Sequence, residues 1–501
     1  MKHMAALAMA VVALLATPCA ASELRIALNE DPDLLDPAQG GSFVGREVFA
    51  AMCDKLIDIA PDMSFVPQLA TAWTWSDDAK SLTLNLRDGV LFHDGTRLDA
   101  EAVKANLDRY RTAAESKRKA ELKPVTNVAV VDPLTVRLKL SQRYAPLLAV
   151  LADRAGMILS PATLAAMGDK IGTKPVCAGP YKFAERVAQE RIVLERFDKY
   201  WNAGAYSIDR VTFTPVTDTT VRLAGLRSGG FDIIDQIAAH DADTIKADPA
   251  LQFVEVTALG YNLISINLNN GIAADNPLGK DKRVREAFEK AIDRKILNDV
   301  VFEGKFVPSN QFEAPGTRYW DPAHPVPARD VAGAKKLLAA AGVPHPAFTL
   351  TVGTGSTELQ VAQTLQAMAA EAGFEMKIQA TEAATMVQKN AAGDYQAAFV
   401  IWSGRPDPDG NIAIWIACDG FLNWGKYCNA DLDKNLNAAR MTTDPAERAT
   451  LYANAAAIYL DERPALVLYH FKWLWGISRK VTGFVPNPDG LIRLAGMKVG
   501  S

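Results

Sequence analysis

The segment from residue 348 to residue 402 restricts the fold of this chain more than any other. Strand, helix, strand, helix and strand are expected in turn at 348–352, 357–372, 375–380, 383–392 and 396–402. This order predicts parallel strands joined by right-handed crossovers. In open α/β sheets, ligands bind outside the carboxyl ends of the strands. We therefore expect a functional loop after the last strand, from Trp402 to Gly410.

The pattern before this segment favours strands. Apolar residues alternate with polar ones over 82–86 and over 136–140, as in half-buried strands. Asp99 is placed to cap a helix whose apolar residues fall on one face. Further helices are expected over 282–298 and 335–341, so the chain is predicted to be an α/β protein.

The first 22 residues are predicted to be a secretory signal peptide. Lys2 is followed by an apolar run of twelve residues, Ala5 to Ala16, and then by small residues up to Ser22. This basic start, short apolar core and small-residue end are typical of such a peptide, and the run is shorter than the roughly 20 residues that span a bilayer. Cleavage is expected after Ala21 or Ser22. The mature protein is expected in the periplasm of a Gram-negative bacterium.

Charge and motifs exclude several classes of function. Lys and Arg number 54 against 58 Asp and Glu, a net charge of −4, whereas nucleic-acid-binding proteins normally carry a basic surplus. The sequence has no G-x-S-x-G, H-E-x-x-H or phosphate-loop motif, so no enzyme activity is predicted. Closely spaced Cys or His pairs are lacking too, and we expect neither a metal site nor a cofactor.

Four cysteines remain in the expected mature chain, and an oxidising compartment favours disulfides. Cys418 and Cys428 are ten residues apart and are placed to close a small loop. Cys53 and Cys177 pair only by elimination, and two buried free thiols are the alternative for them.

Tryptophans gather towards the C-terminal part of the chain, where five of nine lie between 402 and 475. Aromatic walls with a few polar groups line many small-molecule clefts, although Trp residues also fill cores. We expect a mixture of both here, with Trp402 and Trp424 as cleft walls.

Several short motifs resemble those of family 5 extracellular solute-binding proteins, the dipeptide-, oligopeptide- and nickel-binding components of ABC importers. The motifs are Leu69 to Asp78, Leu86 to Thr96, Ala178 to Tyr181, Phe197 to Trp201, Arg283 to Arg294, Ala334 to Leu338 and Asp407 to Asp409. They occur in the order of the family, within about residues 24–480.

The resemblance implies a two-lobed periplasmic-binding-protein clamp of the type II-like class. The division implied is lobe I at 23–266, completed by 476–501 and with an extra strand-rich subdomain at about 58–180, and lobe II at 267–475. The chain would cross between the lobes near Leu263 to Leu268 and near Leu466 to Phe471. Two crossing segments permit hinge closure around a ligand.

Arg405 marks a departure from the peptide-binding members that this chain resembles. Those members carry an Asp after Trp-x-Gly, and this Asp pairs with the α-ammonium of a peptide; here Trp402-Ser403-Gly404 precedes an arginine. A guanidinium binds a carboxylate bidentately and repels an ammonium. Asp407 is placed to restore an ammonium contact. The alternative is that Arg405 only pairs with Asp407 or Asp409 at the surface.

We therefore expect the substrate-binding component of an ABC importer, a monomer that delivers a peptide, or a peptide-like or carboxylate-bearing small molecule, to permease subunits. The residues expected to contact this ligand are Arg405, Asp407, Trp402 and Trp424 and, from lobe I, Ser42 and Phe43. An exported hydrolase and a chaperone- or sensor-like use of the same fold are the alternatives. Nickel or haem cargo is not favoured, because none of the six His residues lies between 346 and 469.

Overall fold

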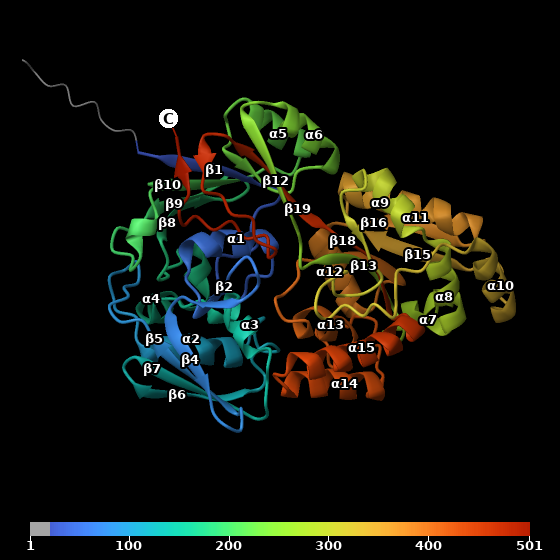
Figure 1. Cartoon of the computed structure of the whole chain (residues 1–501), viewed down its shortest axis with the longest axis horizontal. Coiled ribbons are helices and arrows are strands. Elements are labelled where there is room, and N and C mark those ends of the chain that lie inside the picture. The colour runs from blue at the N-terminus through green and yellow to red at the C-terminus, as the bar shows by residue number, and fades with distance from the viewer. Residues whose placement is uncertain (1–20, 501) are drawn as a thin grey trace, which may run out of the picture.

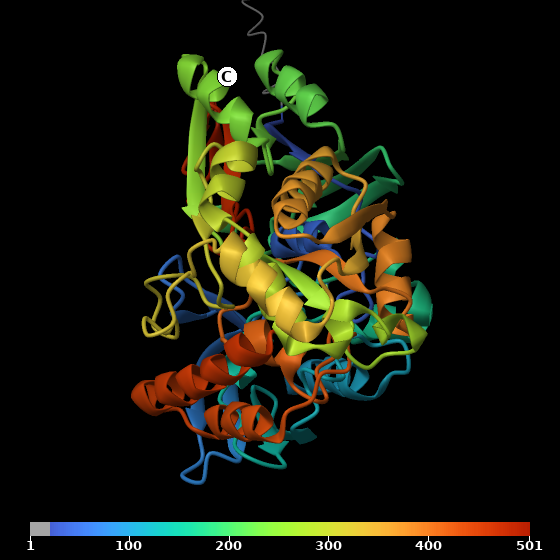
Figure 2. The same cartoon turned by 90° about the vertical axis from the view of Figure 1, so that its right-hand side faces the viewer.

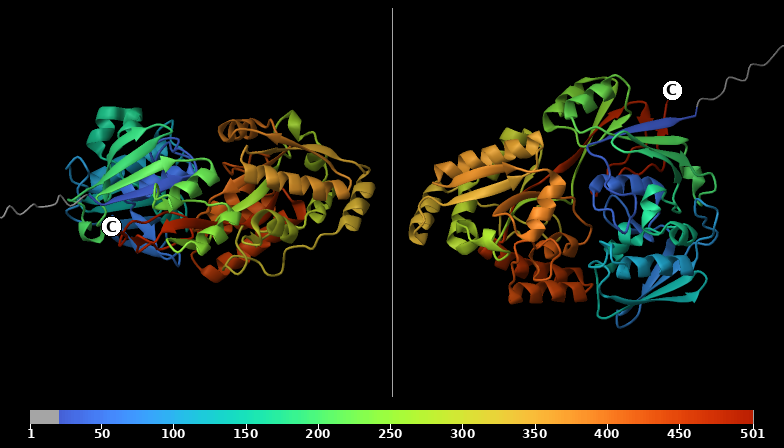
Figure 3. Two further views of the ribbon diagram at one scale, coloured as in Figure 1. Left: turned by 90° about the horizontal axis from the view of Figure 1, so that it is seen from above. Right: turned by 180° about the vertical axis from the view of Figure 1, so that it is seen from behind.

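The computed structural model describes residues 21–500, which form two bodies connected by two neighbouring segments of chain (Figure 1). Views from above and from behind show the two bodies side by side (Figure 3). The predicted signal peptide lies almost entirely at residues 1–20, outside the described residues. Between residues 21 and 500, no helix has the length and apolar character needed to cross a membrane.

Lobe I is built on a seven-stranded sheet. Its strands, in spatial order, are β12 (Leu251–Thr257), β19 (Lys472–Ser478), β11 (Ile233–Ile234), β1 (Glu23–Leu28), β10 (Arg210–Pro215), β9 (Arg191–Arg196) and β8 (Tyr181–Val187). β1 is parallel to both of its neighbours, and the other pairs are antiparallel. The side chains of Leu24, Ile26 and Leu28 are fully buried on one face and that of Ala27 on the other, as expected for a central strand covered on both faces.

A strand-rich subdomain extends lobe I. Its antiparallel sheet contains β4 (Ala70–Trp75), β5 (Ser81–Leu86), β7 (Thr135–Leu140) and β6 (Val125–Asp132), and the hairpin of β2 (Ile57–Ile59) and β3 (Phe65–Pro67) precedes it. Leu82 and Leu84 are buried on one face, which confirms the alternation seen in the sequence. Helix α2 (Ala100–Thr112) covers that face, and the Asp99 side chain caps it by accepting a hydrogen bond from Ala102 N at 2.9 Å.

Lobe II is built on a six-stranded sheet. Its strands, in spatial order, are β14 (Val307–Pro308), β18 (Ala465–His470), β13 (Tyr261–Ile266), β17 (Ala397–Trp402), β15 (Ala347–Val352) and β16 (Glu375–Ala380). β15 is parallel to β16 and to β17, and helices α11 (Ser356–Glu371) and α12 (Ala383–Ala392) connect the three strands. The predicted strand–helix–strand–helix–strand unit is therefore confirmed.

The remaining helices flank these sheets. Lobe I carries α1 (Phe43–Met52), α3 (Leu147–Leu151), α4 (Pro161–Met167), α5 (Thr219–Arg227) and α6 (Ala242–Ala247). Lobe II carries α7 (Pro277–Lys280), α8 (Lys282–Ala291), α9 (Arg294–Phe302), α10 (Val331–Ala341), α13 (Asp409–Ile416), α14 (Ala430–Met441) and α15 (Pro445–Glu462). Lobe II faces the viewer in Figure 2, where the red-orange pair α14 and α15 lies at its lower end. The short strands β20 (Val481–Thr482) and β21 (Lys498–Val499) pair near the C-terminus.

The structure differs from the sequence expectation at the predicted helix 282–298. This segment forms two helices, α8 and α9, because Ile292 is extended and the Asp293 side chain caps a new helix by accepting from Ile296 N at 2.9 Å. The helical spacing of apolar residues continues across this break, so the sequence pattern predicted a single helix.

The crossing segments also differ from the expectation. β13 and β18 lie within the sheet of lobe II, and β12 and β19 lie within the sheet of lobe I. The chain therefore passes between the two sheets at Ala258 to Gly260 and at Phe471, where Ala258 N donates to Phe471 O at 3.0 Å. Both expected segments are apolar strands, but their composition alone does not reveal which sheet they join.

Candidate functional site

A cavity of about 420 Å³ lies between the two lobes. Its lobe I wall comes from residues 120–153, at the edge of the strand-rich subdomain. Its lobe II wall comes from the loop after β17, from α13 and from residues 419–440. The lining includes Lys123, Tyr144 and Asp153 from lobe I, and Trp402, Arg405, Asp407, Asp409, Asp419, Phe421 and Arg440 from lobe II. The carboxyl end of β17 thus forms part of the cavity, where the strand order predicted a functional loop.

Two ion pairs join the lobes at this cavity. Arg405 Nε lies 3.0 Å from Asp153 Oδ2, and Lys123 Nζ lies 2.9 Å from Asp419 Oδ2. The side chains of the first pair are only 12% and 7% exposed, whereas those of the second are 72% and 62% exposed. The cavity therefore has a deep end at Arg405 and an open mouth at Asp419.

The loop that follows β17 is shaped by one glycine and one asparagine. Gly404 has a φ of +83°, and a Cβ atom there would lie 2.4 Å from the carbonyl carbon of Leu259, so the position requires glycine. Asn411 Oδ1 accepts from Arg405 N at 2.7 Å and from Trp402 Nε1 at 3.2 Å, and Asn411 Nδ2 donates to Arg405 O at 3.0 Å. Asn411 therefore fixes both the backbone of Arg405 and the ring of Trp402.

The Arg405 guanidinium lies against the cavity with one of its ends unused. Its centre is 4.4 Å from the centroid of the Trp402 ring, a cation–π distance, and its Nη1 donates to Gly404 O at 2.8 Å. Its Nη2 forms no hydrogen bond with any residue between 21 and 500. Burial lowers the pKa of Arg405 to about 10, so the group stays charged at neutral pH. A donor on a charged group is thus available to a molecule in the cavity.

Asp153 is surrounded by arginines. Its Oδ1 accepts from Arg46 Nε at 3.1 Å, and Arg154 Nε lies 3.9 Å from the same oxygen. Burial by itself would raise the pKa of Asp153, but the guanidinium groups of Arg46, Arg405 and Arg154 hold it well below its usual range. Three positive groups therefore face one negative group, which leaves two positive charges in excess at the deep end.

Asp407 and Asp409 each have an arginine of their own. Asp407 Oδ1 accepts from Arg448 Nη2 at 2.8 Å, and Asp409 Oδ1 accepts from Arg440 Nε at 2.6 Å. Arg405 instead pairs with Asp153 of the opposite lobe, so the surface pairing considered from the sequence is wrong. Asp407 lines the cavity, and its role as an ammonium contact stays a prediction.

The other predicted contacts lie in different surroundings. Trp402 lines the cavity, whereas the Trp424 ring packs against Trp415 at 5.6 Å inside lobe II and is 8% exposed. Ser42 caps α1 by accepting from Gly45 N at 3.1 Å. Phe43 stacks on Trp473 with a centroid distance of 4.4 Å. Trp424, Ser42 and Phe43 are thus structural neighbours of the site and do not line its cavity.

Sequence reasoning missed the lobe I half of the deep end. Arg46 lies in the middle of α1, and Asp153 lies between α3 and a short 3₁₀ helix, Arg154–Gly156. Neither belongs to a motif that distinguishes it. The single available signal was an Asp-Arg pair inside an otherwise apolar stretch, which is costly unless both charges are matched.

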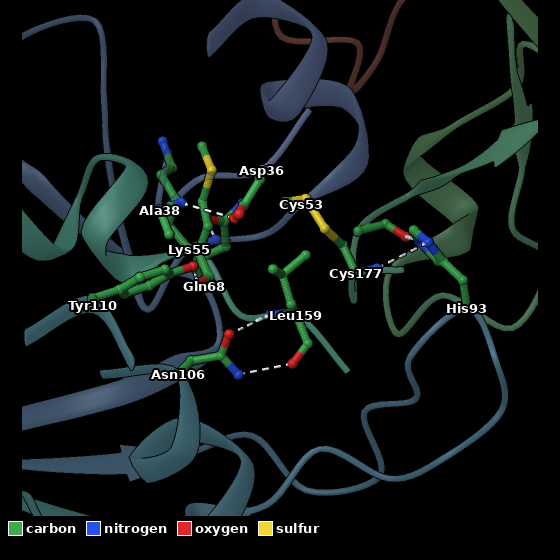
Figure 4. The surroundings of a disulfide bond; sticks show 12 residues. Asp36, Ala38, Cys53, Lys55, Gln68, His93, Asn106, Tyr110, Leu159 and Cys177 are labelled. Carbon is green, nitrogen blue, oxygen red and sulfur yellow. Dashed lines mark hydrogen bonds between the residues drawn. A yellow bond between two sulfur atoms is a disulfide. The ribbon is translucent and has the colours of Figure 1, made fainter. Parts of the chain in front are cut away.

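Two disulfides brace the elements around the site. Cys418 is bonded to Cys428 and closes the loop that carries Asp419 and Phe421. Cys53, at the end of α1, is bonded to Cys177, just before β8 (Figure 4).

Hydrogen bonds fix the segment at Leu159, which forms an isolated antiparallel β-bridge with Cys177. Asn106 of α2 holds both backbone groups of Leu159, with Nδ2 donating to its oxygen at 2.8 Å and Oδ1 accepting from its nitrogen at 3.0 Å (Figure 4). His93 Nδ1 accepts from Cys177 N at 3.3 Å, and burial lowers the pKa of His93 to about 4. This histidine is therefore a structural, neutral group. No set of three or more metal-ligating side chains is found within residues 21–500.

Comparisons with known proteins place this geometry in a family. Residues 64–423 match the group described as bacterial extracellular solute-binding proteins, family 5 Middle. The chain is 30% identical over 502 residues to the glutathione-binding protein GsiB of Salmonella paratyphi A, with 97% of this chain and 96% of that protein covered. The GsiB of Escherichia coli K12 is 29% identical over 498 residues, with 97% and 96% covered.

Solved structures with the same fold extend the comparison. The periplasmic binding protein AgaA of A. tumefaciens R10, in complex with agropinic acid, superposes with a TM-score of 0.85 at 27% identity and covers 96% of this chain and 99% of its own. A dipeptide-binding protein of Pseudoalteromonas sp. SM9913, in complex with Met-Leu, superposes with a TM-score of 0.87 at 21% identity, covering 95% and 100%.

Two lobes on separate sheets, two crossing segments and a charged cavity between the lobes define a two-lobed solute-binding protein. The match over residues 64–423 makes the assignment specific: the chain belongs to family 5 of the bacterial extracellular solute-binding proteins. The family and its relatives are binding proteins of ABC importers and not enzymes.

Proposed function

We propose that this protein captures a carboxylate-bearing peptide or peptide-like compound in the periplasm, as a monomer, and delivers it to the permease subunits of an ABC importer. The observation that carries the proposal is Arg405, a buried cation with a free donor at the wall of the interlobe cavity. A guanidinium in such a place pairs favourably with a carboxylate. The two excess positive charges around Asp153 favour an anionic ligand over a neutral or cationic one.

The ligands of the relatives support the same proposal. Glutathione and Met-Leu are peptides, and agropinic acid is an acid. A cavity of about 420 Å³ lies within the range of pockets that bind small molecules. Trp402 beneath Arg405 supplies an apolar wall for such a compound.

Calorimetry tests the proposal with glutathione, Met-Leu and agropinic acid, each as the free acid and as its methyl ester. At least one acid should bind, and it should bind more tightly than its ester. Removing one partner of a desolvated charge pair costs about 2–5 kcal/mol, so Arg405→Ala should weaken binding of that acid by roughly thirtyfold or more. The same variant should bind acid and ester almost equally.

Arg137→Ala is the matched control. Arg137 lies on β7, its Nε bonds to Thr83 Oγ1 at 3.3 Å on an exposed face, and its loss should leave binding unchanged. If Arg405→Ala binds the acid as well as the unmodified protein does, and still prefers acid to ester, Arg405 is not the anion anchor. If no compound of the three classes binds and none co-purifies, the ligand class is wrong.

A further inference from the structure

Asp153 places a carboxylate of lobe I directly against Arg405. Its Oδ2 lies 3.0 Å from Arg405 Nε, close enough for an ion pair, although the two groups are not aligned as a hydrogen bond. A bidentate carboxylate ligand would use the guanidinium edge formed by Nε and Nη2. The charge of Asp153 therefore already offsets that of Arg405, and Nη2 remains for a molecule in the cavity.

Lobe I keeps this carboxylate in a fixed position. Asp153 Oδ1 accepts from Arg154 N at 2.7 Å and from Arg46 Nε at 3.1 Å, and the side chain is 7% exposed. Arg154 is itself anchored, since its Nη1 donates to Gly40 O at 3.1 Å. A carboxylate bound from two sides in this way presents its second oxygen to the opposite lobe without freedom to turn away.

Asp153 also differs from the other acids of the cavity in the charge around it. The other lining acids pair one to one with a cation: Asp407 with Arg448, Asp409 with Arg440, Asp419 with Lys123 and Glu121 with Arg118. Asp153, by contrast, is shared by Arg46, Arg154 and Arg405. Neutralising Asp153 would therefore raise the excess charge at the deep end from two to three.

We propose that Asp153 is a specificity-determining residue that excludes small free carboxylates from this cleft by offsetting the charge of Arg405 in place of a ligand carboxylate. The inference rests on the proposed role of Arg405 as the anion anchor. A small acid such as acetate or succinate gains little at the deep end, because Arg405 is already paired. An acid carried on a larger compound has the same limited pairing at Nη2 but adds contacts along the cavity, for example with Trp402 and Phe421.

Binding of simple carboxylates at constant ionic strength tests the proposal. The probes are acetate, succinate and citrate, with succinamide as the uncharged analogue, and the readout is the apparent dissociation constant from thermal shift. The unmodified protein should bind them weakly. Asp153→Asn should bind succinate at least tenfold more tightly, with a larger gain for citrate than for acetate and none for succinamide.

Two further variants locate the effect. Adding Arg405→Gln to Asp153→Asn should abolish the gain, because the gain depends on the freed guanidinium. Glu255→Gln breaks an ion pair with Lys472 that lies outside the cavity, and it should give no gain. Asp153→Ser is a second neutral variant in case Asp153→Asn yields little folded protein.

The results separate this inference from the proposed function. The inference is overturned if the neutral variants bind succinate no better than the unmodified protein, or if the double variant keeps the gain. Such a result leaves the acid-over-ester preference of the unmodified protein intact, so the anion anchor would survive. Conversely, if the unmodified protein shows no preference for acid over ester, the proposed role of Arg405 as anion anchor is wrong, whether or not the neutral variants bind succinate more tightly.

Discussion

Replacing Asn411 with alanine should lower the free energy of unfolding more than the loss of a small polar side chain usually does. Asn411 is 2% exposed, and its side chain forms four hydrogen bonds. Oδ1 accepts from Arg405 N at 2.7 Å and Trp402 Nε1 at 3.2 Å, and Nδ2 donates to Arg405 O at 3.0 Å and Glu313 Oε1 at 2.9 Å. Alanine would leave these partners unpaired.

The magnitude follows from the number of hydrogen-bonding groups left without a partner. A buried group left without its hydrogen bond costs about 1–3 kcal/mol. The four hydrogen bonds are partly buried, so we expect their loss in Asn411→Ala to lower the free energy of unfolding by about 2–5 kcal/mol. The Trp402 ring also loses its restraint, so near-ultraviolet circular dichroism should change even in the folded protein.

Urea unfolding, followed by tryptophan fluorescence, measures this loss. Asn435→Ala is the matched control, because Asn435 lies on α14 and its side chain donates only to Asp431 O of the same helix, at 2.8 Å. That substitution should change stability by less than about 0.5 kcal/mol. A loss below 1 kcal/mol for Asn411→Ala, with an unchanged near-ultraviolet spectrum, would refute the view that Asn411 organises the loop after β17.

Two further predictions concern charge and covalent bracing. Burial raises the pKa of Glu313 to about 7, so its carboxyl is protonated in the folded protein at acidic pH. Its contribution to stability is complete below the unfolded pKa of about 4.3 and is lost as the pH rises through 7. Glu313→Gln should therefore flatten this decline, which amounts to about 3–4 kcal/mol, in urea titrations between pH 5 and 8; an unchanged slope would contradict the assignment. The Cys53–Cys177 disulfide closes 124 residues and Cys418–Cys428 closes 10, so by chain entropy their removal as alanine pairs should cost about 5 and about 3 kcal/mol. Equal losses, or free thiols at these positions in exported protein, would oppose this account.

Local pattern determined much of the fold in advance. The strand–helix–strand–helix–strand unit of lobe II follows from hydrophobic periodicity, and so do the strands at 82–86 and 136–140 and the helix capped by Asp99. These features depend on residues close together in sequence, where side-chain spacing and capping decide the outcome. The same reasoning failed at Ile292, because a capping Asp broke a helix whose apolar spacing continued.

The sequence also indicated part of the site. The strand order placed a functional loop after Trp402, and the charge of Arg405 distinguished this chain from the peptide binders it resembles. Both are local facts, and the structure places both residues at the wall of the cavity. Trp424 shows the limit of this reasoning, since residue type alone did not tell a cleft wall from a core residue.

Only the tertiary structure decided what Arg405 faces. Its partner Asp153 is 252 positions away in the sequence, in the other lobe, and Arg46 completes the group from a third element. Each of these charges is unfavourable in its own local setting and is tolerated because burial brings the others within about 3 Å. Ion pairs of this kind depend on how the two lobes are placed against each other, and no local pattern in the sequence predicts that placement.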